Sequence, residues 1–173
     1  MSTHSMRSQF GRAAFAACIA CAASAAVAQF STMREAMLVA EWFDRFEPIH
    51  KECQQHYGKD PAAQPDIPKF VQTMREICSS TRLSRPPIPE DIPVDVYRQL
   101  RAGRDCLIEL PAKLAEGMEN RLRVDAIPNL REGERQVLRK QFGDPIAKTL
   151  ERCQTPLDQF GGVTKAARKA TAR

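Results

Sequence analysis

Two histidines and a cysteine recur at three-residue intervals in the segment His50-x-x-Cys53-x-x-His56. Imidazole and thiolate groups are ligands that suit zinc or copper. On a continuous helix, however, the two histidines point about 120° apart and lie roughly 9 Å apart along the axis. His56 pairs better with Glu52, one helical turn earlier. A metal site formed by His50, His56 and Glu52 is therefore the alternative to a disulfide cysteine flanked by two surface histidines.

A helical bundle can also hold haem through a methionine and a histidine. The expected helices carry four methionines, but the chain has no Cys-x-x-Cys-His attachment motif. These methionines are Met33, Met37, Met74 and Met118. Methionine on an apolar helix stripe is typical core filler. Metal or haem binding through His50 and/or His56 is thus the second functional hypothesis, and the leading one requires no cofactor.

Signatures of common enzyme classes are missing from the sequence. The eight glycines are scattered and form no phosphate-binding loop, and no Gly-x-Ser-x-Gly nucleophile motif occurs. Carboxylates at helical spacing stand among Arg and Lys, which is typical of solvated helix faces. The sequence therefore predicts a protein that binds and does not catalyse.

The first 28 residues have the pattern of a secretory signal peptide. Arg7 and Arg12 come before an apolar, Ala-rich run over residues 13–27, and Ala26-Val27-Ala28 places small residues before Gln29. The run is shorter than the roughly 20 residues that span a bilayer. A lipoprotein is the main alternative, but the residues before the two cysteines of this run form poor lipobox sequences. We predict cleavage after Ala28 and a periplasmic or secreted mature chain.

Cysteine usage agrees with export. Four cysteines follow the signal segment, namely Cys53, Cys78, Cys106 and Cys153. An even number in an exported chain predicts two disulfides, each contributing ~3 kcal/mol by restricting the unfolded chain. Three pairings are possible, and loop closure favours neighbours, Cys53 with Cys78 and Cys106 with Cys153. The alternative is that one or more of these cysteines are free and buried.

Positive charge is concentrated at the two ends of the chain. The net charge of +5 falls to +3 without Arg7 and Arg12. The last 13 residues carry four cations and no acid, namely Lys165, Arg168, Lys169 and Arg173. Without these four, residues 29–160 have a net charge of −1, which argues against a nucleic-acid-binding body. The tail is expected to contact an anionic envelope surface or to serve as a solubilising end.

Apolar residues recur at helical spacing, and no stretch alternates as a strand does. The longest amphipathic run, Thr32–Tyr57, begins with a capping box formed by Thr32 and Glu35. Pro48 is expected to kink or break this helix. A second helix is expected to be capped by Asp66, with a proline in its first turn.

A connector is expected between the second and third helices. Residues 82–93 contain four of the twelve prolines, which favours an extended, polyproline-like segment. Such a segment either docks on a partner or spaces two helices of the bundle. The third helix begins near residues 93–95, and Pro111 is expected to kink it or to begin a new one.

The C-terminal part is expected to break into short helices. Asn129 resembles a cap, Gly143 a stop, and Asp144-Pro145 a new start. Pro156 and the glycine pair at 161–162 are expected to end the ordered structure. The tail over residues 161–173 has few apolar groups to bury, so we expect it to be disordered.

These patterns together predict an all-α fold. Residues 29–160 are expected to form a disulfide-stapled bundle of four to six helices, with the Pro-rich connector inside it and a disordered basic tail after it. The leading functional hypothesis is an exported, non-enzymatic helical binding protein, such as an adaptor, inhibitor or chaperone-like module. Its partner is expected to be a protein and not a nucleic acid, and the mature chain is expected to have no transmembrane segment.

Overall fold

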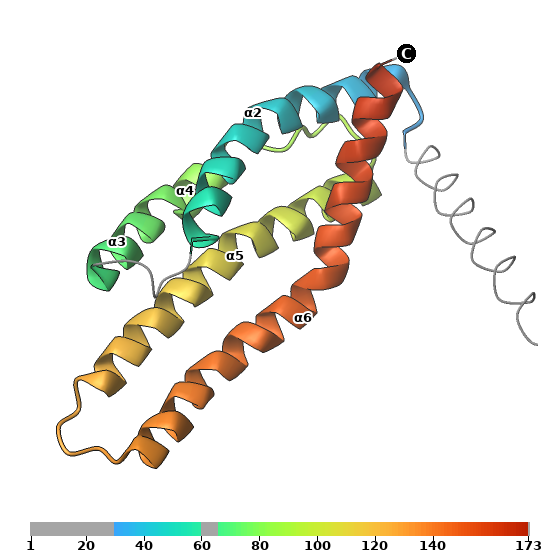
Figure 1. Cartoon of the computed structure of the whole chain (residues 1–173). Helices are drawn as coiled ribbons and strands as arrows, with labels where there is room; N and C mark the ends of the chain where they lie inside the picture. Colours follow the sequence, from blue (N-terminus) through green and yellow to red (C-terminus); the bar gives the residue numbers. More distant parts are fainter. Residues whose placement is uncertain (1–29, 60–65, 173) are drawn as a thin grey trace, which may run out of the picture.

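A computed structural model describes residues 30–59 and 66–172, and in these two ranges the chain forms helices and no strand (Figure 1). Its elements are α2 (Met33–Tyr57), α3 (Ile67–Ile77), the single turn α4 (Ser80–Leu83), α5 (Val94–Asp125) and α6 (Glu132–Thr171). The predicted all-α class is confirmed, with three long helices, the shorter α3 and the single turn α4 among the described residues. The predicted signal peptide and Arg173 lie outside the described residues.

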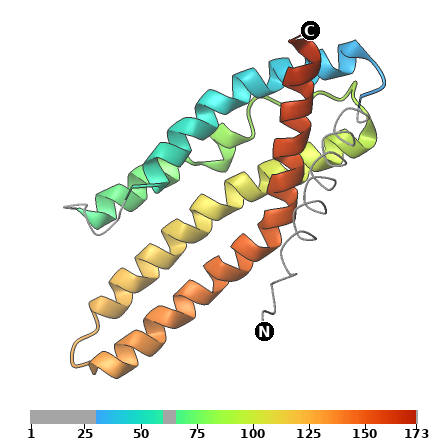
Figure 2. The same ribbon diagram turned by 45° about the vertical axis from the view of Figure 1, so that its right-hand side comes forward.

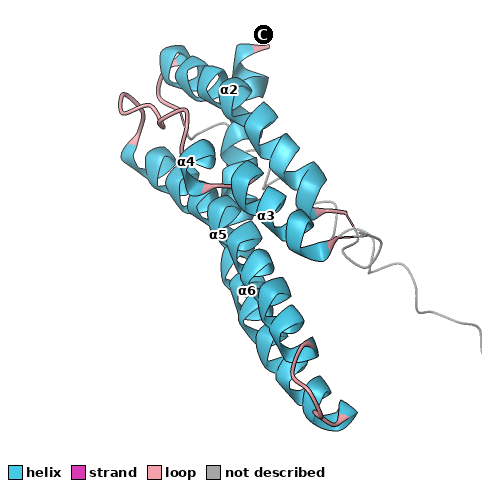
Figure 3. Ribbon diagram, turned by 90° about the vertical axis from the view of Figure 1, so that its left-hand side faces the viewer, coloured by secondary structure: helices cyan, strands magenta, loops and turns pink. Residues whose placement is uncertain are grey.

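The two longest helices, α5 and α6, form an antiparallel hairpin that the other helices cover on one part of its length (Figures 1 and 2). Helix α2 lies over the open end of the hairpin, where α6 ends, and α3 lies beside α5. The closed end of the hairpin extends past both of them (Figure 3). The molecule therefore has a layered part and a projecting two-helix arm.

Helix α2 begins as its sequence predicts. The Thr32 hydroxyl accepts a hydrogen bond from the amide of Glu35 at 3.2 Å, and the Glu35 carboxylate accepts one from the amide of Thr32 at 3.1 Å, which confirms the capping box. The helix continues through Pro48 without ending. Buried side chains on both sides of this proline, Phe46 and Cys53, hold the two halves against the same core.

The core is centred on Trp42. Its indole stacks on Phe46, with ring centroids 5.2 Å apart, and meets the edge of Phe160 from α6 at 6.0 Å. The indole N–H donates to the backbone oxygen of Pro86 at 3.0 Å, so this fully buried side chain leaves no polar group unpaired. Trp42 therefore joins α2, α6 and the connector in one contact region.

Two disulfides staple the helices in the pairing that loop closure favours. Cys53 bonds Cys78, joining α2 to the C-terminal end of α3, with Cα atoms 5.0 Å apart. Cys106 bonds Cys153, joining α5 to α6, with Cα atoms 5.6 Å apart. The chain-entropy model assigns about 3.5 and about 4 kcal/mol to loops of these lengths. The predicted stapling and its neighbour pairing are confirmed.

Helix α5 runs through Pro111, which is buried inside it, so the expected new start is absent and the helix is continuous. An interior proline removes one hydrogen bond and costs roughly 3 kcal/mol. The cost is offset because the helix is packed into the same core before and after it, as the buried Leu100 and Ala115 show. The connector before α5 lies outside any helix over residues 84–93 and buries Ile88 and Ile92.

The expected division of the C-terminal part is wrong, because residues 132–171 form a single helix. It passes Pro145 and Pro156 and changes direction part-way along its length (Figure 1), as prolines inside helices commonly cause. Its start also differs from the sequence-based expectation. Arg131 and Glu134 flank the first turn, the Arg131 amide donating to the Glu134 carboxylate at 3.0 Å. Asn129 lies before the helix with φ at 63°.

The expectation of a disordered tail is wrong as well. Residues 161–171 belong to α6, and Val163 and Ala167 are fully buried. The Arg168 guanidinium donates to Asp44 at 2.6 Å and Glu47 at 2.8 Å, both on α2. Small apolar residues therefore hold the last turns of α6 on α2. The boundary expected at residue 160 is not a boundary of structure.

Because the tail is packed, two neighbouring substitutions should change the free energy of unfolding by different amounts. Val163→Ala removes buried methyl groups and should lower the free energy of unfolding by about 2 kcal/mol. Lys165→Ala, on the exposed side of the same turn, should change it by about 0.5 kcal/mol or less. Urea unfolding followed by circular dichroism measures both. Equal, negligible effects would show that the tail is not packed.

Gly103 predicts a second stability difference, because a Cβ atom built there would lie 2.3 Å from the Cβ of Phe160. Gly103→Ala must separate α5 from α6 and should cost about 1–3 kcal/mol. Gly161→Ala is the matched control, since no atom lies within 4 Å of the added carbon. The control should gain about 0.5–1 kcal/mol from the lost flexibility of glycine. Thermal melts of both variants measure the difference, and a neutral Gly103→Ala would contradict the close contact.

Candidate functional site

The residues of the predicted metal site are each engaged elsewhere. The His50 ring stacks on Phe46, with centroids 5.8 Å apart. The His56 ring stacks on Phe70 of α3 at 4.6 Å, and its Nε2 lies 3.1 Å from the Phe70 carbonyl oxygen. The Glu52 carboxylate accepts a hydrogen bond from Arg82 at 2.7 Å. The structure therefore directs the three residues to three different neighbours.

No group of three potential metal ligands gathers within residues 30–59 and 66–172. Cys53, which stands between the two histidines, is bonded to Cys78. The four methionines considered for haem differ in their exposure to solvent. Met33 and Met37 are exposed, Met74 is buried in the core, and Met118 is half-buried beside α3. The metal- and haem-binding hypothesis thus gains no site from the geometry.

The basic residues of the tail do not form one uniform surface. Arg168 is occupied by Asp44 and Glu47, and its guanidinium carbon lies 4.6 Å from the centre of the Phe43 ring. The hydrogen bonds with Glu47 and Asp44 raise the pKa of Arg168. Lys165 and Lys169 are exposed one helical turn apart, and Arg173 lies outside the described residues. Contact with an anionic envelope surface remains a prediction that rests on these two lysines.

His50 is the residue of the predicted metal site whose ionisation the fold changes clearly. Its Nε2 is buried and has no hydrogen-bond partner among the described residues. Burial lowers the pKa of His50, and the nearby Glu47 carboxylate opposes that change only in part. An imidazolium at this position would be poorly solvated, so the folded protein prefers the neutral ring.

A groove lies between the antiparallel helices α3 and α5, and we name it the α3–α5 groove. Its first hollow has a volume of about 350 Å³ and its second about 250 Å³. The first is lined by Pro68, Val71, Gln72, Arg75, Glu119, Leu122 and Arg123. The second is lined by Met74, Arg75, Cys78, Ser79, Ser80, Ile108, Pro111 and Ala112. Arg75 borders both hollows, which follow one another along α3.

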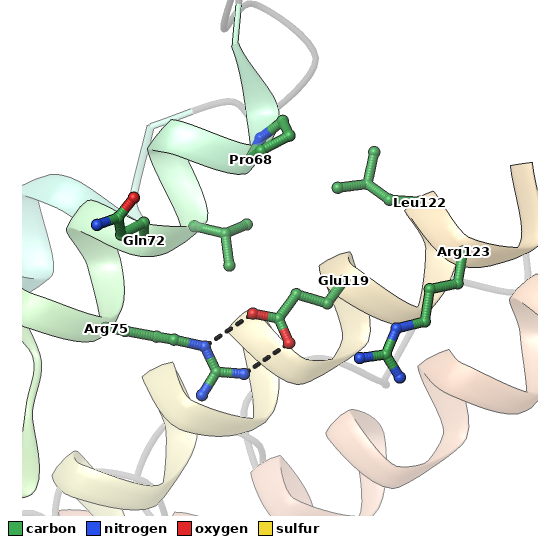
Figure 4. A pocket seen from close by; sticks show the side chains of 7 residues that line it. Pro68, Gln72, Arg75, Glu119, Leu122 and Arg123 are labelled. Carbon is green, nitrogen blue, oxygen red and sulfur yellow. Dashed lines mark hydrogen bonds and ion pairs between the residues drawn. The ribbon is translucent and has the colours of Figure 1, made fainter. Parts of the chain in front are cut away.

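An ion pair crosses this groove between its two hollows. Arg75 from α3 donates twice to Glu119 from α5, Nε to Oε1 at 2.8 Å and Nη2 to Oε2 at 2.7 Å (Figure 4). The bond to Glu119 raises the pKa of Arg75. Both side chains are more than a third exposed, so the pair contributes modestly to stability. The ion pair keeps two charged groups at the surface of the groove, above apolar floor residues.

One cation of the groove is not paired. Figure 4 shows Arg123 on the side of Glu119 opposite to Arg75. Arg123 makes no hydrogen bond or ion pair with its side chain in the part of the chain that the structure describes. With Arg75 and Glu119 neutralising one another, this end of the groove carries one positive charge above an apolar floor of Val71 and Leu122.

A second, more enclosed cavity lies on the other side of α3. Its volume is about 130 Å³, and residues of four helices line it: the last residue of α2 and residues within α3, α5 and α6. It is lined by Tyr57, Phe70, Met74, Leu114, Gly117, Met118, Arg121 and Ile146. We name it the junction cavity.

Sequence reasoning missed both sites, although a signal for the groove was present. Pro68, Gln72 and Arg75 follow one another at steps of four and three, which places them along one face of α3. Such spacing also describes an ordinary solvated face. The position of α5 beside that face is what makes it the wall of a groove, and periodicity carries no information about that position.

Comparison with known proteins does not identify a fold family or a function for this chain. No protein-family model matches the chain, and neither curated proteins nor solved structures give a match.

The state of His50 predicts a pH effect on stability. Because its pKa is lowered from 6.5 in the folded protein, the unfolded chain binds a proton first as the pH falls. The free energy of unfolding should therefore decline from about pH 6.5 downward through the folded pKa of His50. His50→Leu should flatten the curve between about pH 6.5 and pH 5. Denaturant titrations at a series of pH values measure both proteins.

Glu47 affects the stability of the protein in a separate, lower pH range. Its hydrogen bond with Arg168 lowers its pKa from 4.5, so the stability it contributes is lost only as the pH falls through that lowered value. An unchanged decline between pH 6.5 and pH 5 in His50→Leu would therefore contradict the role of His50.

Proposed function

We propose that the protein is an exported, non-enzymatic helical binding protein that holds a segment of a partner protein in the α3–α5 groove. The groove is the observation that carries the proposal. The groove has apolar floor residues, a polar rim and an unpaired cation. Its two helices are kept in place by a core that a disulfide staples. Rigid support of this kind reduces the entropy lost when a partner binds.

Export is supported by the cysteines. Two disulfides join the helices, which is consistent with an oxidising compartment. The N-terminal segment that predicts secretion lies outside the described residues. No described helix is long and apolar enough to cross a membrane. A periplasmic or secreted location is therefore part of the proposal.

Binding is favoured over catalysis by the state of the reactive groups. All four cysteines of the described residues are bonded to one another, so none of them offers a thiolate nucleophile. Carboxylates near the groove are paired with cations at the surface, as Glu119 is with Arg75 and Glu116 with Lys113. These pairs resemble structural ion pairs more than an acid and base held for proton transfer.

The partner segment is expected to be amphipathic and acidic. Apolar side chains would cover Val71, Leu122 and Ile108 on the floor. A carboxylate beside them would meet Arg123, which makes no ion pair among the described residues. The two hollows span three turns of α3, and a groove of this length suits a short helix or extended segment of another protein. Adaptors, inhibitors and chaperone-like modules share this mode of binding.

The test begins with capture at defined positions. A photoreactive amino acid replaces Gln72, which lines the groove, or Glu41, an exposed residue of α2 outside it. The proposal expects one protein of the native host envelope to crosslink from position 72 and not from position 41. That protein is then purified, and its affinity for the whole mature chain is measured by calorimetry.

Matched substitutions then locate the contact. Ala112→Arg places a bulky cation in the second hollow, whereas Ala102→Arg changes an equally exposed alanine of α5 that does not line the groove. The first should weaken binding at least about tenfold, and the second should leave it unchanged. Both variants should keep the melting temperature of the wild-type protein, because both positions are exposed. Equal affinity of the two variants, or crosslinking that does not favour position 72, would refute binding in the groove.

A further inference from the structure

The junction cavity differs from the groove in shape and chemistry. It lies where α2 ends, between α3, α5 and α6, and most of its lining residues are apolar. Most of that wall is formed by flexible or aromatic apolar side chains, namely Phe70, Met74, Leu114, Met118 and Ile146. Apolar cavities of about 150 Å³ bind small apolar molecules. Methionine side chains also adapt their shape to an incoming group.

One cation stands at this apolar space. Arg121 from α5 lines the cavity, and its Nη2 lies 3.9 Å from where a Cβ atom of Gly143 on α6 would be. The guanidinium therefore reaches across from α5 to α6. Ile146, one turn after Gly143, lines the same cavity. No carboxylate lies within ion-pair distance of Arg121 among the residues that the structure describes.

We propose that the junction cavity binds a short-chain carboxylate, with its alkyl chain inside the cavity and its carboxylate on Arg121. The volume of about 130 Å³ sets the size of the apolar part. A cavity of about 150 Å³ holds benzene, so a chain of about four to six carbons fits. A longer chain would have to leave the cavity, and a ligand without an anion would leave Arg121 without a partner.

Tyr57 adds a second polar group to the lining. Burial raises the pKa of the Tyr57 phenol, so this side chain remains neutral at physiological pH. A neutral hydroxyl donates to a carboxylate and does not repel it. One cation and one neutral phenol therefore line the cavity, and no carboxylate of the described residues lines it.

The experiment titrates the whole mature protein with hexanoate and follows backbone amide shifts by NMR. Saturable shifts are expected at Gly117, Met118 and Ile146, which line the cavity. Butyrate, shorter by two methylene groups, should bind about 15-fold more weakly at roughly fourfold per group. Hexanol and hexylammonium, which have a similar chain and no negative charge, should bind at least about tenfold more weakly than hexanoate.

Two substitutions on the same helix separate specific binding from general charge attraction. Arg121→Gln should weaken hexanoate about tenfold, while Arg123→Gln, which lines the α3–α5 groove, should not change it. Both arginines are exposed, so both variants should keep the wild-type melting temperature. Equal weakening by both variants, or equal affinity for hexanoate and hexanol, would overturn the proposal, as would unsaturated shifts spread over the surface. Ala112→Arg tests the groove and should leave hexanoate binding intact, so either proposal can fail without the other.

Discussion

The contact between Phe160 and Gly103 is the constraint on which the rest of the structure depends. A Cβ atom at Gly103 would overlap Phe160, so the absence of a side chain lets α6 approach α5 closely at this point. Phe160 then reaches Trp42, Phe43 and Phe46 of α2 through edge contacts of about 6 Å. One aromatic ring thereby joins three helices that are far apart in the sequence. Close packing of this kind is sensitive to a single added carbon.

Two disulfides extend that constraint to the rest of the bundle. One fixes α3 to α2 and the other fixes α6 to α5, each at some distance from the aromatic cluster. Helix α3 is short, and alone it would be marginally stable. Held by Cys78 and by the Arg75–Glu119 ion pair, it forms one wall of the α3–α5 groove and of the junction cavity. Both candidate sites therefore depend on a helix that covalent and ionic links keep in place.

The two candidate sites lie on different faces of α3, and an arginine of α5 lines each of them. Arg123 lines the open groove, whereas Arg121, two residues earlier, lines the more enclosed junction cavity. Positions two residues apart on a helix point in different directions, so neighbouring arginines of α5 reach different sites. Neither arginine makes an ion pair among the described residues.

Local chemistry determined much of this protein from its sequence alone: the all-α class, the capping of α2 by Thr32 and Glu35, and the disulfide pairing that short loops favour. These features depend on residues close together in the chain. Tertiary packing alone decided that α6 continues through two prolines and a glycine pair, because the burial of Val163 and Ala167 on α2 outweighs local signals that end helices. It also decided where the histidines point and where the groove and cavity lie. Those features depend on which helix faces which, and helical periodicity is the same for a solvated face and for the wall of a site.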